Sequence, residues 1–239
     1  MAASIALSPN VSPGRRGPIL WVVLHTMEVA YDTPTGAARW AARWFADPQS
    51  GVSGHCCVDR TDLITCVDDT DTAWAARSTG NVHGLHLEFA GFAAEGRDTW
   101  LGRRSMLRLG AVWLADRCRR HGLPLSPLGP AELAVRAAGV TTHAAVSEAF
   151  RESEHTDPGA GFPVDELLRL AALAQGPWPG RVLRSRSPRL VGDDVGMVQA
   201  RLVLLGYDPG VADGVFGAAT AAAAQAFQQS RGLVADGAV

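Results

Sequence analysis

The 239-residue sequence contains no lysine, so arginine supplies all 22 basic residues. Together with abundant alanine and glycine, this bias indicates GC-rich coding rather than a functional adaptation. A basic excess is also missing, because 24 acidic residues give a formal net charge of −2. General binders of polyanions carry a strong basic excess. We therefore expect no nucleic-acid partner.

Long apolar segments are absent near the N-terminus. The longest strongly apolar run there covers only residues 19–24, whereas a membrane-spanning helix needs about 20 apolar residues. The run also lacks the longer core and small-residue cleavage site of a secretory signal. We expect no membrane insertion, and synthesis in the cytoplasm without export by this sequence alone.

Cysteine is scarce, with four residues in the whole chain. That number does not build the disulfide framework of a small secreted protein in a chain of this length. Cys56 and Cys57 are adjacent, and we predict that both are buried strand residues. A metal-binding role for this pair is the alternative.

The remaining composition is that of a soluble globular protein, with 47% hydrophobic and 19% charged residues. We predict a loose N-terminal arm over residues 1–17 and a catalytic α/β domain, with a mixed central β-sheet flanked by helices, over 18–175. A small all-α unit over 188–239 follows a linker, 176–187, rich in proline and arginine. We expect this linker to be a flexible, solvated tether between two independently folded units. Binding of its arginines to an anionic polymer is the alternative.

Four segments define the predicted catalytic domain most clearly. The apolar, β-branched run 19–25 predicts a buried strand that ends at His25. Residues 82–91 predict another strand, and 35–47 an amphipathic helix. The segment 103–122 predicts the longest helix, with Gly122 placed as its C-terminal cap.

Three chelating side chains lie near predicted strand ends or turns. His25 ends a buried strand, and His143 and Asp157 can come from one loop folded over that end. Two imidazoles and a carboxylate suit zinc, and three protein ligands leave a fourth position for water. Glu88, within an apolar strand, is the candidate to carry the proton to a leaving nitrogen. Alternatively, Asp157 belongs to an ordinary Asp-Pro-Gly turn.

The order and spacing of four segments resemble the zinc-dependent N-acetylmuramoyl-L-alanine amidases, which include phage endolysins and are related to the peptidoglycan recognition proteins. The resemblance covers roughly residues 18–170 and implies that His25, His143 and Asp157 bind zinc. It also places Glu88 at the position of the family's catalytic glutamate. The segments are VVLHTMEVAY, GVSGHCCVDRTDLITCVDDTDTAWAARS, GLHLEFAG and GVTTHAAVSEAFRESEHTDPGAGF.

His155 departs from the family pattern, since many relatives carry lysine two residues before the aspartate. The resemblance implies that His155 stabilises the developing oxyanion, either as a charged imidazolium or as a neutral hydrogen-bond donor. It also places His55 and Trp74 near the cleft. Trp74 either packs against the protein or lines the substrate groove.

The C-terminal segment 188–239 resembles the small helical peptidoglycan-binding module of many wall hydrolases. Its DDVGMVQARLVLLGY, ADGVFG and AFQQSRG motifs carry the resemblance. We expect Leu202, Leu205 and Phe227 in its core, and Gly214 and Gly217 for their backbone conformation. Related modules often run a few residues further, so a shortened last helix is expected to weaken folding or binding.

These features predict a monomeric, two-domain cell-wall hydrolase, the endolysin of a phage with a GC-rich host. Its partner is peptidoglycan, and its cofactor is Zn²⁺. The expected reaction cleaves the amide between N-acetylmuramic acid and L-Ala, with the enzyme held in the host cytoplasm until lysis. The alternatives are a non-catalytic peptidoglycan recognition protein and a zinc peptidase that cuts the stem peptide.

Overall fold

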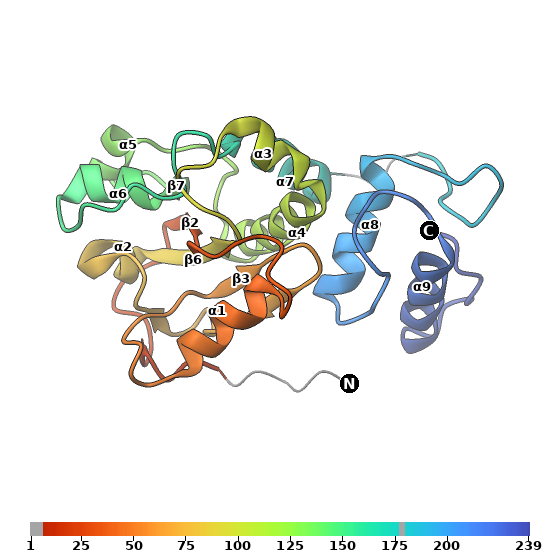
Figure 1. Ribbon diagram of the computed structural model, residues 1–239, viewed down its shortest axis with the longest axis horizontal. Helices are drawn as coiled ribbons and strands as arrows, with labels where there is room; N and C mark the ends of the chain where they lie inside the picture. Colours follow the sequence, from red (N-terminus) through yellow and green to blue (C-terminus); the bar gives the residue numbers. More distant parts are fainter. Residues whose placement is uncertain (1–6, 177–179) are drawn as a thin grey trace.

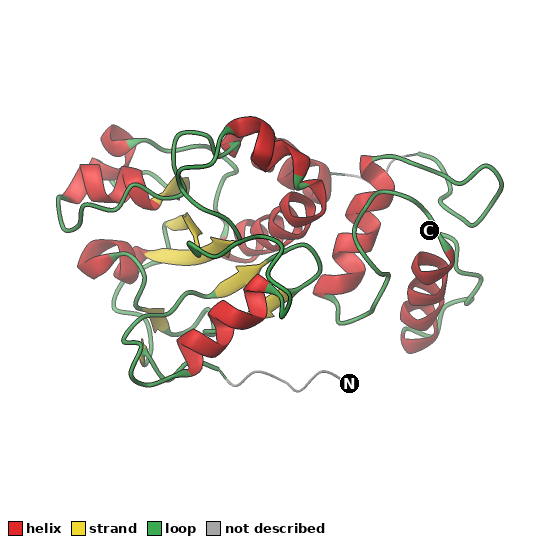
Figure 2. Cartoon of the chain, viewed as in Figure 1, coloured by secondary structure: helices red, strands yellow, loops and turns green. Residues whose placement is uncertain are grey.

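A five-stranded β-sheet lies at the centre of the larger unit, with helices on both of its faces (Figure 2). The structure is a computed structural model that describes residues 7–176 and 180–239. The strand order is β4-β3-β6-β2-β7, and only β4 runs antiparallel to its neighbour. The predicted α/β class with a mixed sheet is confirmed. The sheet strands are β2 (Trp21–Thr26), β3 (Cys56–Val58), β4 (Leu63–Thr65), β6 (Gly84–Phe89) and β7 (Gly139–Thr142).

The helices before α8 surround this sheet, whereas α8 and α9 lie to one side of it (Figure 1). The predicted strand ending at His25 and the predicted strand around Glu88 are confirmed as β2 and β6. The helix ending at Gly122 is also confirmed, and Gly122 adopts the left-handed conformation of a C-terminal cap, with φ +66°. None of the described helices is long and apolar enough to cross a membrane. The other elements are β1 (Val11–Ser12), β5 (Thr72–Ala73), α1 (Ala37–Ala46), α2 (Arg77–His83), α3 (Arg97–Gly102), α4 (Arg104–His121), α5 (Pro130–Ala134), α6 (His143–Phe150), α7 (Val164–Gln175), α8 (Asp193–Leu204) and α9 (Ala218–Ser230).

Side chains of β2 and β6 point alternately to the two faces of the sheet. One face is apolar, and the other carries the polar site residues. Val22 and Leu24 of β2 point into the main core, which α4 and α7 complete. Successive strand residues face opposite sides of a sheet, so His25 lies on the other face. In the parallel register His25 is the neighbour of Glu88, which is in turn the neighbour of Cys57. The sheet therefore brings His25 and Glu88 together before any loop contributes.

The described part of the N-terminal segment is not loose, contrary to expectation. Asn10 is 3% exposed, and its Nδ2 donates to the carbonyl oxygens of Phe45 (3.0 Å) and Asp47 (2.8 Å). It thereby satisfies carbonyl groups left open at the end of α1. Arg15 likewise donates to the carbonyls of Val82 and Gly84, at 3.0 Å each. Residues 1–6 of the predicted arm and 177–179 of the predicted linker lie outside the described residues.

The C-terminal helices α8 and α9 enclose a small apolar cluster of their own. Leu202 is buried and Phe227 packs against the cluster, as predicted, but Leu205 is 49% exposed. The prediction was wrong for Leu205 because this C-cap residue of α8 borders an open apolar groove, which it lines together with Leu202 and Phe227. Gly214 has φ +83°, which favours glycine, whereas Gly217 adopts an ordinary φ of −107°.

The two units pack against each other. This packing differs from the flexible, solvated tether that was predicted between them. Met197 and Ala200 of α8 and Ala212 belong to the same apolar cluster as α4 and α7. The linker also packs, since Leu183 is fully buried and exchanges two backbone hydrogen bonds with Val239, at 2.7 and 2.8 Å. The two units are packed because α8 has an apolar face, and contact with α4 removes this face from water. The boundaries at 175 and 188 remain predictions.

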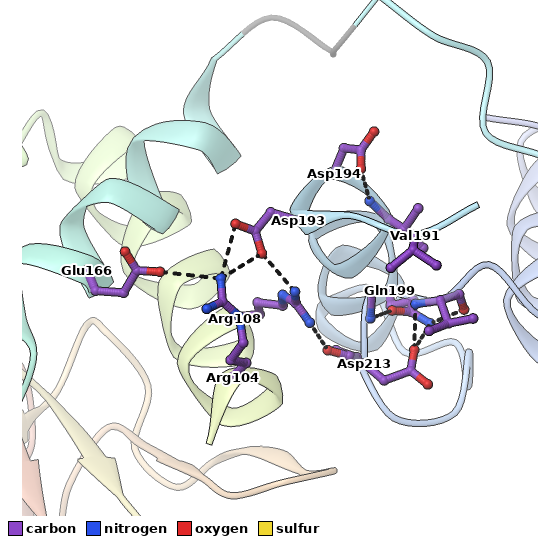
Figure 3. A network of polar contacts seen from close by, with 12 residues as sticks. Arg104, Arg108, Glu166, Val191, Asp193, Asp194, Gln199 and Asp213 are labelled. Atoms are coloured by element: carbon purple, nitrogen blue, oxygen red, sulfur yellow. Dashed lines mark hydrogen bonds and ion pairs between the residues drawn. The ribbon is translucent and has the colours of Figure 1, made fainter. Parts of the chain in front are cut away.

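Arg108 is the main polar connection across this junction (Figure 3). It is 5% exposed, and its guanidinium donates to Asp193 Oδ1 (2.7 Å) and to the Ala212 carbonyl (2.9 Å). Asp193 also accepts a hydrogen bond from Arg169 (2.8 Å). A Cβ on Gly196 would lie 2.4 Å from Arg108 Nε, so α8 needs glycine where the arginine crosses it. The junction thus combines a shared core with a buried ion pair.

We expect Asp193→Ala to destabilise the protein by roughly 2–3 kcal/mol, because Arg108 would stay buried without its carboxylate. This is below the effect for a fully buried pair, since Asp193 is 25% exposed. The matched control is Asp194→Ala, which removes the next residue of α8 and its pair with the exposed Arg181. Equal losses for the two variants in denaturant unfolding would contradict a stabilising role for the buried pair.

Candidate active site

A cleft of about 620 Å³ opens at the ends of β2 and β6, and all five predicted site residues line it. His25 and Glu88 come from the sheet, and α1 forms one wall. His143 begins α6, while His155 and Asp157 lie in the loop that follows. The expectation that His143 and Asp157 share one loop is therefore wrong in detail, since a helix separates them. The cleft therefore brings together the five side chains that were predicted to form the site.

Three ligand atoms converge at the base of this cleft. His25 Nδ1 lies 3.1 Å from Asp157 Oδ2, and His143 Nδ1 lies 3.1 Å from Asp157 Oδ1. One ligand atom from each residue falls within 4.8 Å of the others, and all three residues are buried. Ligands about 2.0–2.2 Å from a tetrahedral metal are themselves roughly 3.3 Å apart. The donor set and its spacing therefore fit a metal ion.

Local structure holds His143 and Asp157 in place. Thr142 caps α6 by accepting the Ala145 N–H (3.1 Å), which orients the first helical residue, His143. The Ala144 N–H donates to the Asp157 carbonyl (2.9 Å) and joins the helix start to the loop. Backbone hydrogen bonds next to His143 and Asp157 therefore hold the two side chains in their relative positions.

The turn after Asp157 depends on glycine. Gly159 has φ +83°, and a Cβ there would lie only 1.9 Å from the Ala93 carbonyl oxygen. Only a residue without a side chain permits both the backbone conformation and this close approach. The Asp-Pro-Gly sequence is thus a turn, as its composition suggests, and it also fixes Asp157 against the loop after β6.

Burial and hydrogen bonding set the protonation preferences of the ligands. Burial favours a raised pKa for Asp157, but hydrogen bonds from His143 and His25 outweigh it and keep that pKa below its ordinary value. Burial is the main cause of the lowered pKa of His143. An ionised carboxylate and a neutral imidazole are the forms that bind a metal.

Glu88 lies beside this ligand set in a confined environment. It is 7% exposed, and burial, followed by repulsion from Asp157 and Glu28, raises its pKa well above the ordinary value. A Cβ on Gly54 would come within 2.9 Å of Glu88 Cγ, so glycine leaves the space that this side chain occupies. A carboxyl group with a raised pKa holds a proton more readily than an ordinary glutamate does, as proton transfer between water and a leaving group requires.

His155 lies at the solvent side of the site. Its side chain is 61% exposed, its Nδ1 is 3.4 Å from Asp157 Oδ1, and its ring stacks on His143 with centroids 4.4 Å apart. Of the other residues expected near the cleft, His55 is buried and does not line it. Trp74 lies outside the lining and donates from Nε1 to Ser12 Oγ (3.0 Å). Trp74 is nonetheless 38% exposed, so its choice between packing and substrate contact stays a prediction.

Cys56 and Cys57 are fully buried strand residues, as predicted. Among the described residues, the only group with metal-ligand spacing is His25, His143 and Asp157, and it contains no cysteine. Burial raises the pKa of both thiols well above the ordinary value. Neither thiol is prepared for metal binding in this environment.

Four residues around the site were not predicted from the sequence. Trp40 and Trp44 are nearly half exposed and stack with their rings 6.3 Å apart on the α1 wall of the cleft. Their i, i+4 spacing on the polar side of an amphipathic helix was the available signal. Glu28 lines the cleft and accepts from Thr26 Oγ1 (2.6 Å). His86 contacts His25, and strict alternation in GLHLEF would have placed it on the Glu88 face.

Comparison with protein families assigns both parts of the chain. The model of the N-acetylmuramoyl-L-alanine amidase family matches residues 15–160, which is more than half of the chain. That of the peptidoglycan-binding domain family matches residues 191–239. Comparison with curated proteins gave no significant match.

Three solved structures resemble this chain at low sequence identity. Staphylococcus aureus hydrolase AmiA, in complex with its ligand, matches with a TM-score of 0.52 and 18% identity, over 68% of this chain and 78% of that one. A mutant endolysin from Bacillus subtilis gives 0.45 and 16%, over 72% and 98%. The amidase LysC from Clostridium intestinale gives 0.40 and 13%, over 70% and 90%. At these identities the AmiA likeness supports the fold alone.

We expect the purified protein to carry about one divalent metal ion per chain, removable by chelator, because three converging ligands form one site. His143→Ala should lose most of this metal, whereas His121→Ala, which removes a histidine paired with Asp69 away from the cleft, should keep it. Elemental analysis of the two variants checks the assignment. Stoichiometric metal in the His143→Ala protein would refute the ligand set.

Proposed function

The chain belongs to the N-acetylmuramoyl-L-alanine amidase family, and we propose that it works with a zinc ion held by His25, His143 and Asp157. The bond cleaved is the amide between the lactyl group of N-acetylmuramic acid and L-Ala of the stem peptide. The observation that carries this proposal is the convergence of the three ligands beside buried Glu88 in one cleft. The family match favours catalysis over a purely recognising protein.

The ligand set supports zinc because imidazole nitrogen and carboxylate oxygen are donors that it prefers, and three protein ligands leave a position for water or substrate. When bound, zinc polarises a carbonyl group and makes water acidic enough to react near neutral pH. His25, His143 and Asp157 hold the site away from bulk solvent, since each is at most 8% exposed.

Glu88 is proposed to carry the proton. Its carboxylate takes a proton from the attacking water and later gives it to the leaving nitrogen of L-Ala, which departs as a free amine. The raised pKa supports both steps, because a carboxyl group of ordinary acidity would hold that proton too weakly. Its neighbour in the sheet register is His25, so the carboxylate lies next to the reacting centre.

The remaining cleft residues are proposed to bind the substrate. His155 presents an exposed imidazole beside Asp157, where an N–H donor can stabilise the oxyanion that forms at the attacked carbonyl. Trp40 and Trp44 offer a stacked apolar surface on the opposite wall. An exposed aromatic pair at a cleft rim suits contact with the partly apolar sugar and lactyl groups.

The C-terminal unit is proposed to hold the enzyme on the wall. Its match to the peptidoglycan-binding domain family supports peptidoglycan as the partner. We further propose a monomeric endolysin that stays in the host cytoplasm until lysis and acts on the wall afterwards. In this proposal the protein neither binds nucleic acid nor inserts into a membrane.

Glu88→Gln should lower turnover by about 10²–10⁴-fold, the usual contribution of a general acid–base group. Gln keeps the shape of the side chain but cannot take up the proton, and the metal ligands stay intact. We therefore expect a normal zinc content and melting temperature. Glu148→Gln, at an exposed position of α6, is the control and should retain full activity.

The measurements are amide cleavage, zinc content and thermal unfolding on the same preparations. Turnover of Glu88→Gln within about threefold of the parent would remove Glu88 from the mechanism, because general acid–base catalysis is worth far more. A large loss of stability with little loss of turnover per folded molecule would indicate a structural role instead.

A further inference from the structure

The imidazole rings of His25, His86 and His55 form a row on the face of the sheet that carries the cleft. His25 is the member at the proposed metal site, and the other two lie further from it. His25 Nε2 is 3.0 Å from His86 Nδ1, with the ring centroids 5.1 Å apart. His86 stacks in turn on His55, with centroids 5.5 Å apart. His86 is fully buried and does not line the cleft. Burial of a polar side chain costs free energy unless the side chain forms hydrogen bonds, so a fully buried histidine indicates a specific role.

The backbone fixes His86 independently of His25. His86 is the register partner of Val23, so the parallel pairing places its side chain one step inward from His25 on the same face. Its N–H donates to His55 Nδ1 (3.0 Å), and its carbonyl accepts the His55 N–H (2.9 Å). A Cβ on Gly84 would lie 2.9 Å from His86 Cε1, so the ring also occupies space that glycine provides.

The two ring nitrogens of His25 have different surroundings. Nδ1 faces Asp157 at 3.1 Å, and Nε2 faces His86 Nδ1. A metal ligand must offer a free electron pair, so Nδ1 carries no proton in the loaded site and Nε2 carries one. That Nε2–H points at His86 Nδ1, which accepts it only if the His86 proton is on its own Nε2. This atom has no hydrogen-bond partner among the described residues.

We propose that His86 is a positioning residue for the metal: its Nδ1 accepts a hydrogen bond from His25 Nε2 and so directs His25 Nδ1 at the ion. The inference rests on the proposed zinc site. A hydrogen-bond acceptor behind a ligating histidine fixes its tautomer and ring orientation and strengthens its donor nitrogen. Within residues 7–176 and 180–239, the Nε2 atom of His143, the other proposed histidine ligand, has only a longer contact, to Ser153 Oγ at 3.4 Å.

Two variants of similar size separate this role from packing. His86→Asn places an oxygen acceptor close to the position of Nδ1, whereas His86→Leu fills similar space with no acceptor. We expect the Leu variant to bind zinc about 10–100-fold more weakly, the usual effect of losing such a partner, and the Asn variant to recover most of that loss. Zinc affinity of the full chain is measured by competition with a chelator of known affinity.

Nitrogen NMR of the zinc-loaded wild-type protein gives a second measurement that needs no substitution. The proposal predicts that His86 is protonated at Nε2 and bare at Nδ1. A proton on His86 Nδ1, or zinc binding by the Leu variant as tight as the wild type, would overturn it while leaving the ligand set intact. Failure of the wild-type protein to bind zinc would overturn both. If the Leu variant does not fold, the wild-type spectrum still decides.

Discussion

The parallel pairing of β2 with β6 is the constraint on which the site depends. Its register sets His25 beside Glu88 and Val23 beside His86, and strand alternation turns all three polar side chains to one face. The opposite face is apolar and is sealed by α4 and α7. A shift of one strand by one residue would separate His25 from Glu88 and turn one of the two side chains into that core. Stability and site geometry therefore rest on the same register.

The helix that seals the apolar face also receives the C-terminal unit. Arg108 of α4 reaches Asp193 and Ala212, and Met197 of α8 joins the core beneath it. The cleft lies on the other face of the sheet, and its lining comes entirely from residues 25–157. The C-terminal unit is thus attached to the side of the sheet that faces away from the candidate cleft.

The sequence carried much of this arrangement, but not all of it. The buried strand ending at His25 and the strand around Glu88 were predictable because a polar residue ends or interrupts an apolar pattern. The proposed ligand role of Asp157 came instead from the family resemblance. The junction was not, since Arg108 and Asp193 are 85 positions apart and only the folded chain pairs them. His86 was overlooked although strand alternation marks it. Trp40 and Trp44 became informative only once α1 was seen to border the cleft.

The most direct test of the account is to digest purified peptidoglycan with the zinc-loaded protein and to identify the new chain ends. Cleavage at the proposed bond predicts free amino groups on L-Ala, with glycan strands that keep their length. New amino groups within the stem or the cross-bridge would identify a peptidase. New reducing sugars would identify a glycosidase, and either result would contradict the amidase mechanism built on His25, His143, Asp157 and Glu88.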